Sequence, residues 1–160
     1  MIKMSDLLIL GIGNYLMGDE GVGVHTALAL QKLPIAETID VVDGGTGGFH
    51  LLEFFEIHDK VILIDATLDN NEPGTIRLIT PKFAKDFPRA MSTHDIGLRD
   101  MVNALQLMDK MPEIYLFVVS IESIQQQGIE LTAAIEKAIP DLIEKVIELA
   151  NQLQEKRVLV

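Results

Sequence analysis

Short apolar runs alternate with segments of helical periodicity along nearly the whole chain. Five of these runs are short, mostly continuous and rich in β-branched residues, which is typical of strands buried in a sheet. They cover residues 6–13, 38–45, 60–66, 74–80 and 113–121. Strands that alternate with helices favour an α/β fold with helices on both faces of the sheet. The sequence therefore predicts a three-layer α/β/α sandwich.

The predicted helices lie between and after these strands. They cover residues 20–32, 49–58, 96–108 and 132–156. In the last of them we expect a break or a restart at Pro140, because proline has no amide hydrogen to donate. Apolar residues recur there at helical spacing and are expected to line one face: Leu142, Val146, Leu149 and Leu153.

One connection predicts the direction of a strand. Only "TLDNNEPG", residues 67–74, separates the third and fourth predicted strands. A parallel crossover needs a dozen or more residues. The fourth strand should therefore run antiparallel to the others, at an edge of the sheet.

Length and composition narrow the class of protein. The chain has 160 residues, which predicts one domain over residues 1–160. It has no cysteine, which excludes disulfides and thiolate chemistry and fits a reducing compartment. A net charge of −11 argues against a nucleic-acid partner. No apolar run is long enough for a membrane span, so we expect a cytoplasmic protein.

Polar residues follow several of the predicted strands. Glu20 comes after the first strand, Asp43 ends the second and Asp65 ends the third. His94 precedes the third helix. Ligands of such sheets bind beyond the carboxyl ends of the strands. We therefore expect these four side chains at one rim.

The glycine-rich stretch "LILGIGNYLMGDEGVGVH", residues 8–25, joins the first strand to the first helix. Gly11 and Gly13 fit a dinucleotide fingerprint, but Leu16 stands at its third position. The carboxylates of Asp19 and Glu20 would also repel a pyrophosphate. A nucleoside- or dinucleotide-binding enzyme nevertheless stays open as an alternative, because it would use the same crevice.

Glu20, Asp65 and His94 together offer two carboxylates and one imidazole. That donor set suits zinc, nickel or iron and leaves coordination positions open. We expect the three side chains to lie within one coordination sphere, with Asp65 and His94 exposed to the crevice. Each residue also has a structural explanation. Asp19 would be the N-cap of the first helix, and Glu20 would favour the positive end of that helix.

Five short motifs occur in one order along the chain: "GIGNYLMGDEGVG", "DGGTGG", "VILIDATLDNNEPGT", "STHDIGL" and "GIELT". With them the sequence resembles the maturation endopeptidases of nickel-iron hydrogenases. The resemblance implies a phosphorylase/hydrolase-like sandwich with strand order 2-1-3-5-4 and an antiparallel fourth strand. It also implies a cytoplasmic protease that removes the C-terminal extension of the precursor of a hydrogenase large subunit, after the metal has been inserted.

The resemblance also assigns roles to residues. The family's metal-contacting positions match Glu20, Asp65 and His94, which are the catalytic candidates. Asp43 and Thr46 would touch the substrate peptide or simply form a turn. Nickel would arrive with the substrate, and we expect no tightly bound metal in the isolated protein. The partner would be the hydrogenase precursor, with neither nucleic acid nor membrane involved.

Two questions stay open at this level. The ion would act either as a Lewis acid on water or a carbonyl, or as a recognition handle that positions the scissile bond. A metal-sensing chaperone that binds the hydrogenase subunit without cutting it would show the same residues.

One segment departs from the family pattern. Residues 120–128, "SIESIQQQG", lack the proline expected in the family, so this segment could help to select the substrate.

Overall fold

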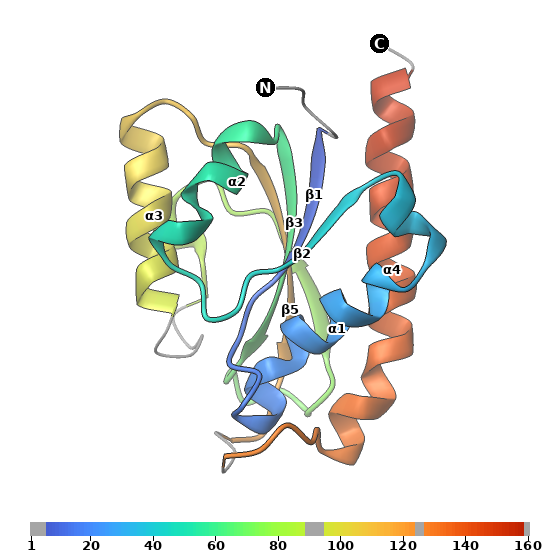
Figure 1. The fold of residues 1–160 in the computed structure, drawn as a ribbon. Coiled ribbons are helices and arrows are strands. Elements are labelled where there is room, and N and C mark those ends of the chain that lie inside the picture. The colour runs from blue at the N-terminus through green and yellow to red at the C-terminus, as the bar shows by residue number, and fades with distance from the viewer. Residues whose placement is uncertain (1–5, 89–94, 124–126, 159–160) are drawn as a thin grey trace.

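The computed structural model describes residues 6–88, 95–123 and 127–158, and in these a five-stranded sheet lies between two layers of helices (Figure 1). The strands are β1 (Leu7–Gly11), β2 (Asp40–Asp43), β3 (Lys60–Thr67), β4 (Ile76–Ile79) and β5 (Glu113–Ser120). The α-helices are α1 (Val22–Gln31), α2 (Leu52–Ile57), α3 (Asp95–Leu107) and α4 (Ala133–Val158). Short 3₁₀ helices are η1 (Gly18–Gly21), η2 (Pro34–Glu37), η3 (Phe49–Leu51) and η4 (Ala84–Asp86).

The strand order is β2-β1-β3-β5-β4, as the family resemblance implied. β1 pairs in parallel with β2 and β3, and β3 pairs in parallel with β5. β4 runs antiparallel to β5 at the edge of the sheet. The direction predicted from the short 67–74 connection is thus confirmed.

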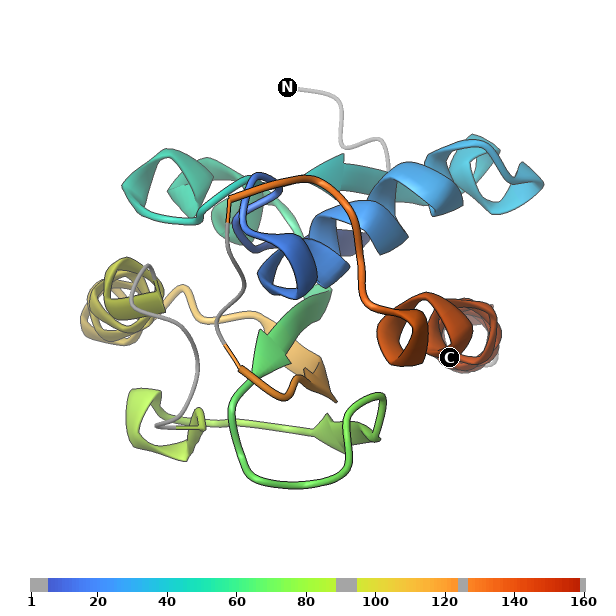
Figure 2. The ribbon, with the colours of Figure 1, turned by 90° about the horizontal axis from the view of Figure 1, so that it is seen from below.

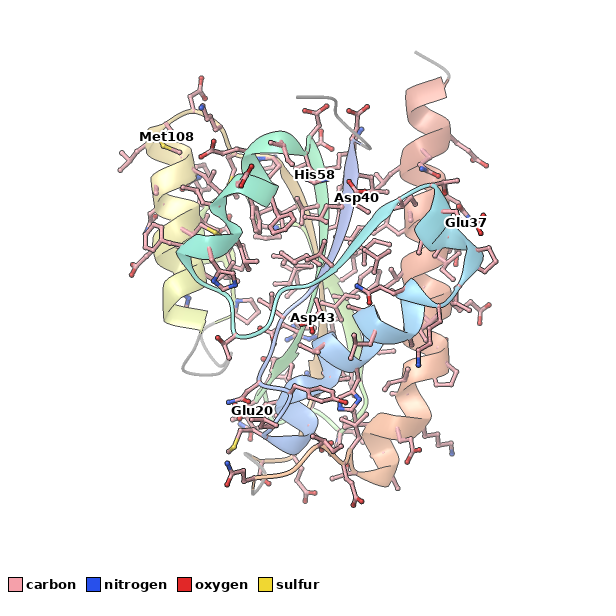
Figure 3. The ribbon with its side chains drawn as sticks, in the orientation of Figure 1. Glu20, Glu37, Asp40, Asp43, His58 and Met108 are labelled. Atoms are coloured by element: carbon pink, nitrogen blue, oxygen red, sulfur yellow. The ribbon has the colours of Figure 1, made fainter. Side chains whose placement is uncertain are left out.

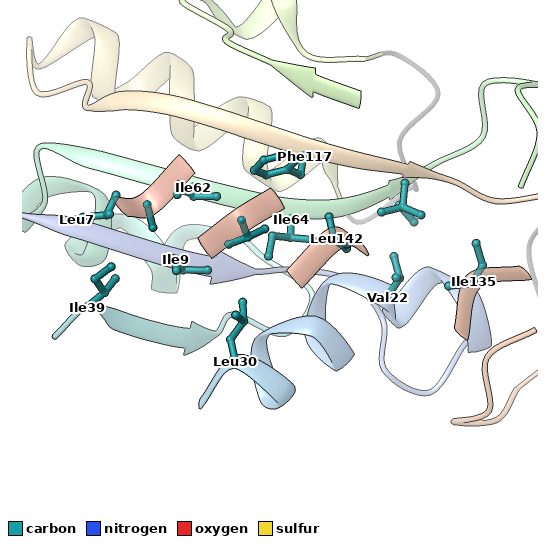
Figure 4. Close-up of a cluster of buried hydrophobic side chains, with 14 of the residues drawn as sticks. Leu7, Ile9, Val22, Leu30, Ile39, Ile62, Ile64, Phe117, Ile135 and Leu142 are labelled. Carbon is teal, nitrogen blue, oxygen red and sulfur yellow. The ribbon is translucent and has the colours of Figure 1, made fainter. Parts of the chain in front are cut away.

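Helices cover the two faces of the sheet in pairs. α1 and α4 lie on one face, and α2 and α3 lie on the other (Figure 1). Successive strand residues point to opposite faces, so the strands contribute to two separate cores. Leu7 and Ile9 of β1 join the core under α1 and α4, seen in Figure 4. Leu8 and Leu10 join the core under α2 and α3.

The long C-terminal helix corrects one expectation. α4 continues through Pro140 without a break. Proline removes the hydrogen bond to the carbonyl of residue 136, but Glu136 and Pro140 are both exposed, so water can solvate that carbonyl. Ile135 and Leu142 are fully buried on either side of the proline, and this packing stabilises the continuous helix.

Two other predicted helices begin differently from the expectation. The helix expected at residue 20 begins at Val22 and is preceded by the separate 3₁₀ helix η1. The helix expected from residue 49 begins as η3, and only Leu52–Ile57 is α-helical. The expected face of α4 is correct, since Leu142, Val146 and Leu153 are buried. Within the described part of the chain, no helix is both long enough and apolar enough to cross a membrane.

Candidate functional site

The parallel strands end at one rim of the sheet, which Figure 2 shows from below. The loop after β1 and the helix η1 lie at this rim, and η1 contacts β3. The segment that precedes α4 passes over the loop after β1 (Figure 2). The candidate residues Glu20, Asp43 and Asp65 all belong to elements or loops at this rim.

The glycines of the loop after β1 serve close packing. A side chain on Gly11 would collide with the carbonyl group of Gly23 and with the Cβ of Ala27. A side chain on Gly23 would in turn collide with the carbonyl oxygens of Ile12 and Ile64. The N-terminus of α1 therefore lies directly against the ends of β1 and β3. The geometric interpretation of these glycines is sufficient, and no phosphate is needed to explain them.

Asp19 does not cap the first helix, contrary to the sequence-based expectation. The N-cap of α1 is Gly21, and it makes no side-chain capping bond. Instead, both carboxylate oxygens of Asp19 accept hydrogen bonds from Thr132, one from its backbone amide and one from its hydroxyl, each at 2.8 Å. Asp19 thus connects η1 with the residue before α4. The carboxylate lies at the positive end of that 26-residue helix.

Glu20 follows Asp19 in η1 and is only 6% exposed. Its backbone amide donates to the carbonyl of Met17 at 3.2 Å, within the 3₁₀ turn. A side chain on Gly13 would collide with the carbonyl oxygen of Glu20, so the loop after β1 fixes the backbone of Glu20 by close contact. Figure 3 shows Glu20 at the lower end of the molecule, which is the carboxyl end of the parallel strands.

Asp65 is fully buried near the end of β3, contrary to the expectation that it is exposed to the crevice. Its Oδ1 atom accepts a hydrogen bond from the amide of Ala66 at 2.8 Å. Val61 and Leu63 pack under α2 and α3, and residues alternate along the strand, so Asp65 belongs to the same face. Burial of a carboxylate is costly unless the group is hydrogen-bonded, paired or bound to a cation.

Asp43 and Thr46 lie in the turn that follows β2, and both are exposed. Oδ1 of Asp43 accepts a hydrogen bond from the amide of Gly45 at 2.9 Å, which is the local bond of an Asx turn. The carbonyl of Gly45 accepts from the amide of Gly13 at 2.7 Å, so the two glycine turns lie side by side. This geometry supports the turn interpretation of Asp43.

His94 lies outside the described residues. α3 begins at Asp95, the next residue, at the carboxyl end of the parallel strands (Figure 1). Among the residues that the structure describes, no group of three histidines, cysteines or acids has the geometry of a metal site. The expectation that Glu20, Asp65 and His94 share one coordination sphere therefore stays a prediction.

Two buried hydroxyl residues at this rim escaped the sequence analysis. Thr67 and Ser120 face each other at the ends of β3 and β5, and both are buried. They belong to the same face of the sheet as Asp65, by strand alternation. The hydroxyl of Thr67 makes no hydrogen bond to any described residue. Thr67 lies within the "VILIDATLDNNEPGT" motif two residues after Asp65, whereas only strand pairing brings Ser120 beside it.

A family model described as "Hydrogenase maturation protease" matches residues 24–149. The match covers most of the 160 residues and includes Asp65 and His94, while Glu20 lies just before it. The chain belongs to the hydrogenase maturation protease family. Its members are peptidases, which favours cleavage over the non-catalytic alternative.

Individual relatives and solved structures agree with this membership. The hydrogenase 2 maturation protease of Escherichia coli is 32% identical over 144 residues, which is 88% of each chain. The hydrogenase expression/formation protein HupD of Rhizobium leguminosarum is 34% identical, over 88% of this chain and 72% of the relative. The solved structure of the hydrogenase maturating endopeptidase HybD from E. coli superposes with a TM-score of 0.82, at 32% identity. That alignment covers 91% of this chain and 92% of HybD.

Proposed function

We propose that this protease removes the C-terminal extension of a nickel-iron hydrogenase large-subunit precursor after nickel has been inserted. In this proposal Glu20, Asp65 and His94 contact the nickel that the precursor carries. The relatives named above are maturation proteases of hydrogenases, which supports a hydrogenase precursor as the substrate.

The observation that carries the proposal is the burial of two carboxylates on touching elements at one rim. Glu20 is in η1 and Asp65 is in β3, and these elements contact each other. Both residues are at least nine-tenths buried. Anionic groups held away from water on adjacent elements repel each other, and a cation bound by both would relieve that repulsion. Carboxylate and imidazole donors suit nickel, and three protein ligands leave positions for ligands that the precursor supplies.

Nickel acts here as part of the substrate. Contact between the ion and the three side chains would hold the precursor so that its scissile bond lies at the rim. Positioning of this kind converts a weak encounter into an oriented complex and is a large source of rate enhancement. The alternative role, in which the ion polarises water or the scissile carbonyl, uses the same contacts. Asp43 and Thr46, both exposed beside the loop after β1, are the candidates for contact with the peptide.

The test compares nickel-loaded with nickel-free precursor. Protein purified without added metal is first subjected to elemental analysis, and shortening of both precursors is then followed by mass spectrometry. We expect no stoichiometric metal in the protease and cleavage of the loaded precursor alone. Glu20→Gln should abolish this cleavage, whereas Glu53→Gln, an exposed carboxylate on α2, should leave it unchanged.

Other outcomes would contradict the proposal in separate ways. Stoichiometric metal in the isolated protein, with equal cleavage of both precursors, would identify a metalloprotease with a resident ion. Binding of the loaded precursor without any shortening would instead identify a chaperone. Normal cleavage by Glu20→Gln would remove Glu20 from the site.

A further inference from the structure

The segment of residues 127–132, which contains the "GIELT" motif, is bound to the loop after β1 by backbone hydrogen bonds. The amide of Gly128 donates to the carbonyl of Leu16 at 2.6 Å. The amide of Gly18 donates to the carbonyl of Gly128 at 2.8 Å. These bonds form a parallel β-bridge between Met17 and Gly128. The loop that carries Glu20 is therefore held by a chain segment more than a hundred residues away in the sequence.

The side-chain contact between Asp19 and Thr132 completes this attachment. Asp19 is 1% exposed, and Thr132 donates to each of its two carboxylate oxygens. Buried hydrogen bonds to a charged acceptor are stronger than neutral ones, and losing the donor leaves the charge poorly solvated. Thr132 is itself anchored, because its carbonyl accepts the hydrogen bond from the amide of Glu136 in the first turn of α4. The 26-residue helix thus holds the donor in place.

The turn that carries Glu20 has little internal support. η1 is four residues long, and its N-cap residue Met17 makes no side-chain capping bond. Within the turn, the amide of Glu20 donates to the carbonyl of its near neighbour Met17 at 3.2 Å. A single 3₁₀ turn of this kind is weak by itself, so the contacts with the 127–132 segment add to the support that it receives from the loop after β1.

We propose that Thr132 and Asp19 are positioning residues, which fix η1 so that the carboxylate of Glu20 is aligned for the nickel of the precursor. The inference rests on the proposed function, because it needs Glu20 to contact that nickel. Both carboxylate oxygens of Asp19 accept hydrogen bonds from Thr132, so we assign Asp19 to the support of the turn. The two adjacent acids of the "GDEG" stretch thus have separate tasks, one in the support of the turn and one in the site.

The test measures how strongly the protease prefers nickel-loaded over nickel-free precursor, as the ratio of the two dissociation constants. Thr132→Val removes the hydroxyl and keeps the shape of the side chain, and Thr132→Ser keeps the hydroxyl. We expect Thr132→Val to reduce the preference at least about tenfold, the effect of losing one hydrogen bond to a charged group. Thr132→Ser should restore it. Thr38→Val is the matched control, because the Thr38 hydroxyl is exposed and donates only to the carbonyl of Ile35.

A double-mutant cycle with Glu20→Gln separates positioning from general loosening of the fold. If Thr132 acts through Glu20, Thr132→Val has no further effect on the preference once Glu20 is replaced. An equal effect in both backgrounds, or none in either, would overturn the positioning role. If Glu20→Gln alone leaves the preference unchanged, the proposed function fails, and the positioning role fails with it. Should Thr132→Val not fold, Asp19→Asn takes its place in the double-mutant cycle with Glu20→Gln, because it replaces one acceptor oxygen with a donor.

Discussion

The backbone of Gly23 at the start of α1 lies directly against the carbonyl oxygen of Ile64 in β3, with no room for a side chain between them. This contact brings the first turn of α1 to the strand residue that precedes Asp65. It also explains the glycine-rich stretch after β1, because several of its glycines allow backbone segments to touch at the rim.

Gly23→Ala should therefore be severely destabilising. The added methyl group would overlap the carbonyl oxygens of Ile12 and Ile64, so either β3 or α1 must move. We expect a loss of more than about 3 kcal/mol in the free energy of unfolding, measured by urea denaturation. Gly45→Ala is the control: its methyl group meets no atom within 4 Å, and the positive φ of 57° costs only about 1 kcal/mol. Similar losses for both variants would contradict the packing argument.

Asp65→Asn should abolish processing and leave the fold intact. The amide has nearly the same shape, and its oxygen can still accept the hydrogen bond from Ala66. It cannot supply the negative charge for nickel, so we expect the rate of precursor cleavage to fall at least about 100-fold, or ~2.7 kcal/mol. Circular dichroism should show a folded protein, and Asp100→Asn, exposed on α3, should cleave normally. The same loss is expected of His94→Ala. A variant that cleaves at the normal rate would remove its residue from the site.

His58 should matter for stability and not for cleavage. Its Nδ1 atom lies 2.6 Å from the carbonyl oxygen of Phe54, and its Nε2 atom lies 2.8 Å from Oδ2 of Asp40. The ring of this buried histidine thus bridges a backbone carbonyl of α2 and the carboxylate of Asp40. Glu20 and His58 lie toward opposite ends of the molecule (Figure 3).

We therefore expect His58→Gln to lower the free energy of unfolding by about 2 kcal/mol, because a buried hydrogen bond to the Asp40 carboxylate is lost. The rate of cleavage per folded molecule should be unchanged. Thermal denaturation would measure the loss of stability, and precursor processing at low temperature, where the variant is folded, would measure the rate. A large loss of cleavage in a fully folded variant would contradict this separation of the two ends.

Asp69 should make stability depend on pH in the acid range. Burial raises the pKa of its carboxyl group, but hydrogen bonds from Asn71 and the charge of Arg77 outweigh burial and hold the pKa below its usual value. A carboxylate with a lowered pKa stabilises the fold above its unfolded-state pKa, and this contribution is lost as the pH falls through the folded-state pKa.

Asp69→Asn should accordingly lower the free energy of unfolding at pH 7, by no more than about 1 kcal/mol because Arg77 is partly exposed. The difference between the two proteins should shrink as the pH falls through the acid range. Urea denaturation over a series of pH values would measure it. A difference that stays constant over the whole series would show that the charge of Asp69 is not its cause.

Local patterns were sufficient for most of the architecture. The apolar runs predicted all five strands, because burial on both faces requires continuous apolar residues. The eight-residue connection 67–74 predicted the antiparallel edge strand, because so short a chain cannot cross the sheet. Their positions after strands or before the third helix already made Glu20, Asp65 and His94 candidates, and the resemblance added the strand order and the match to the family's metal-contacting positions. These conclusions depend on residues close together in the sequence, or on motifs in a fixed order.

Other features depend on contacts between distant residues, and only the tertiary structure decided them. Asp19 has the sequence position of an N-cap, yet its carboxylate binds Thr132, 113 residues away. Asp65 has the position of a crevice residue, yet the packing around β3 buries it completely. Pro140 has the chemistry of a helix breaker, yet burial of Ile135 and Leu142 on either side keeps α4 continuous. In each case the local preference is worth about 1–3 kcal/mol, and the packing of distant segments outweighs it.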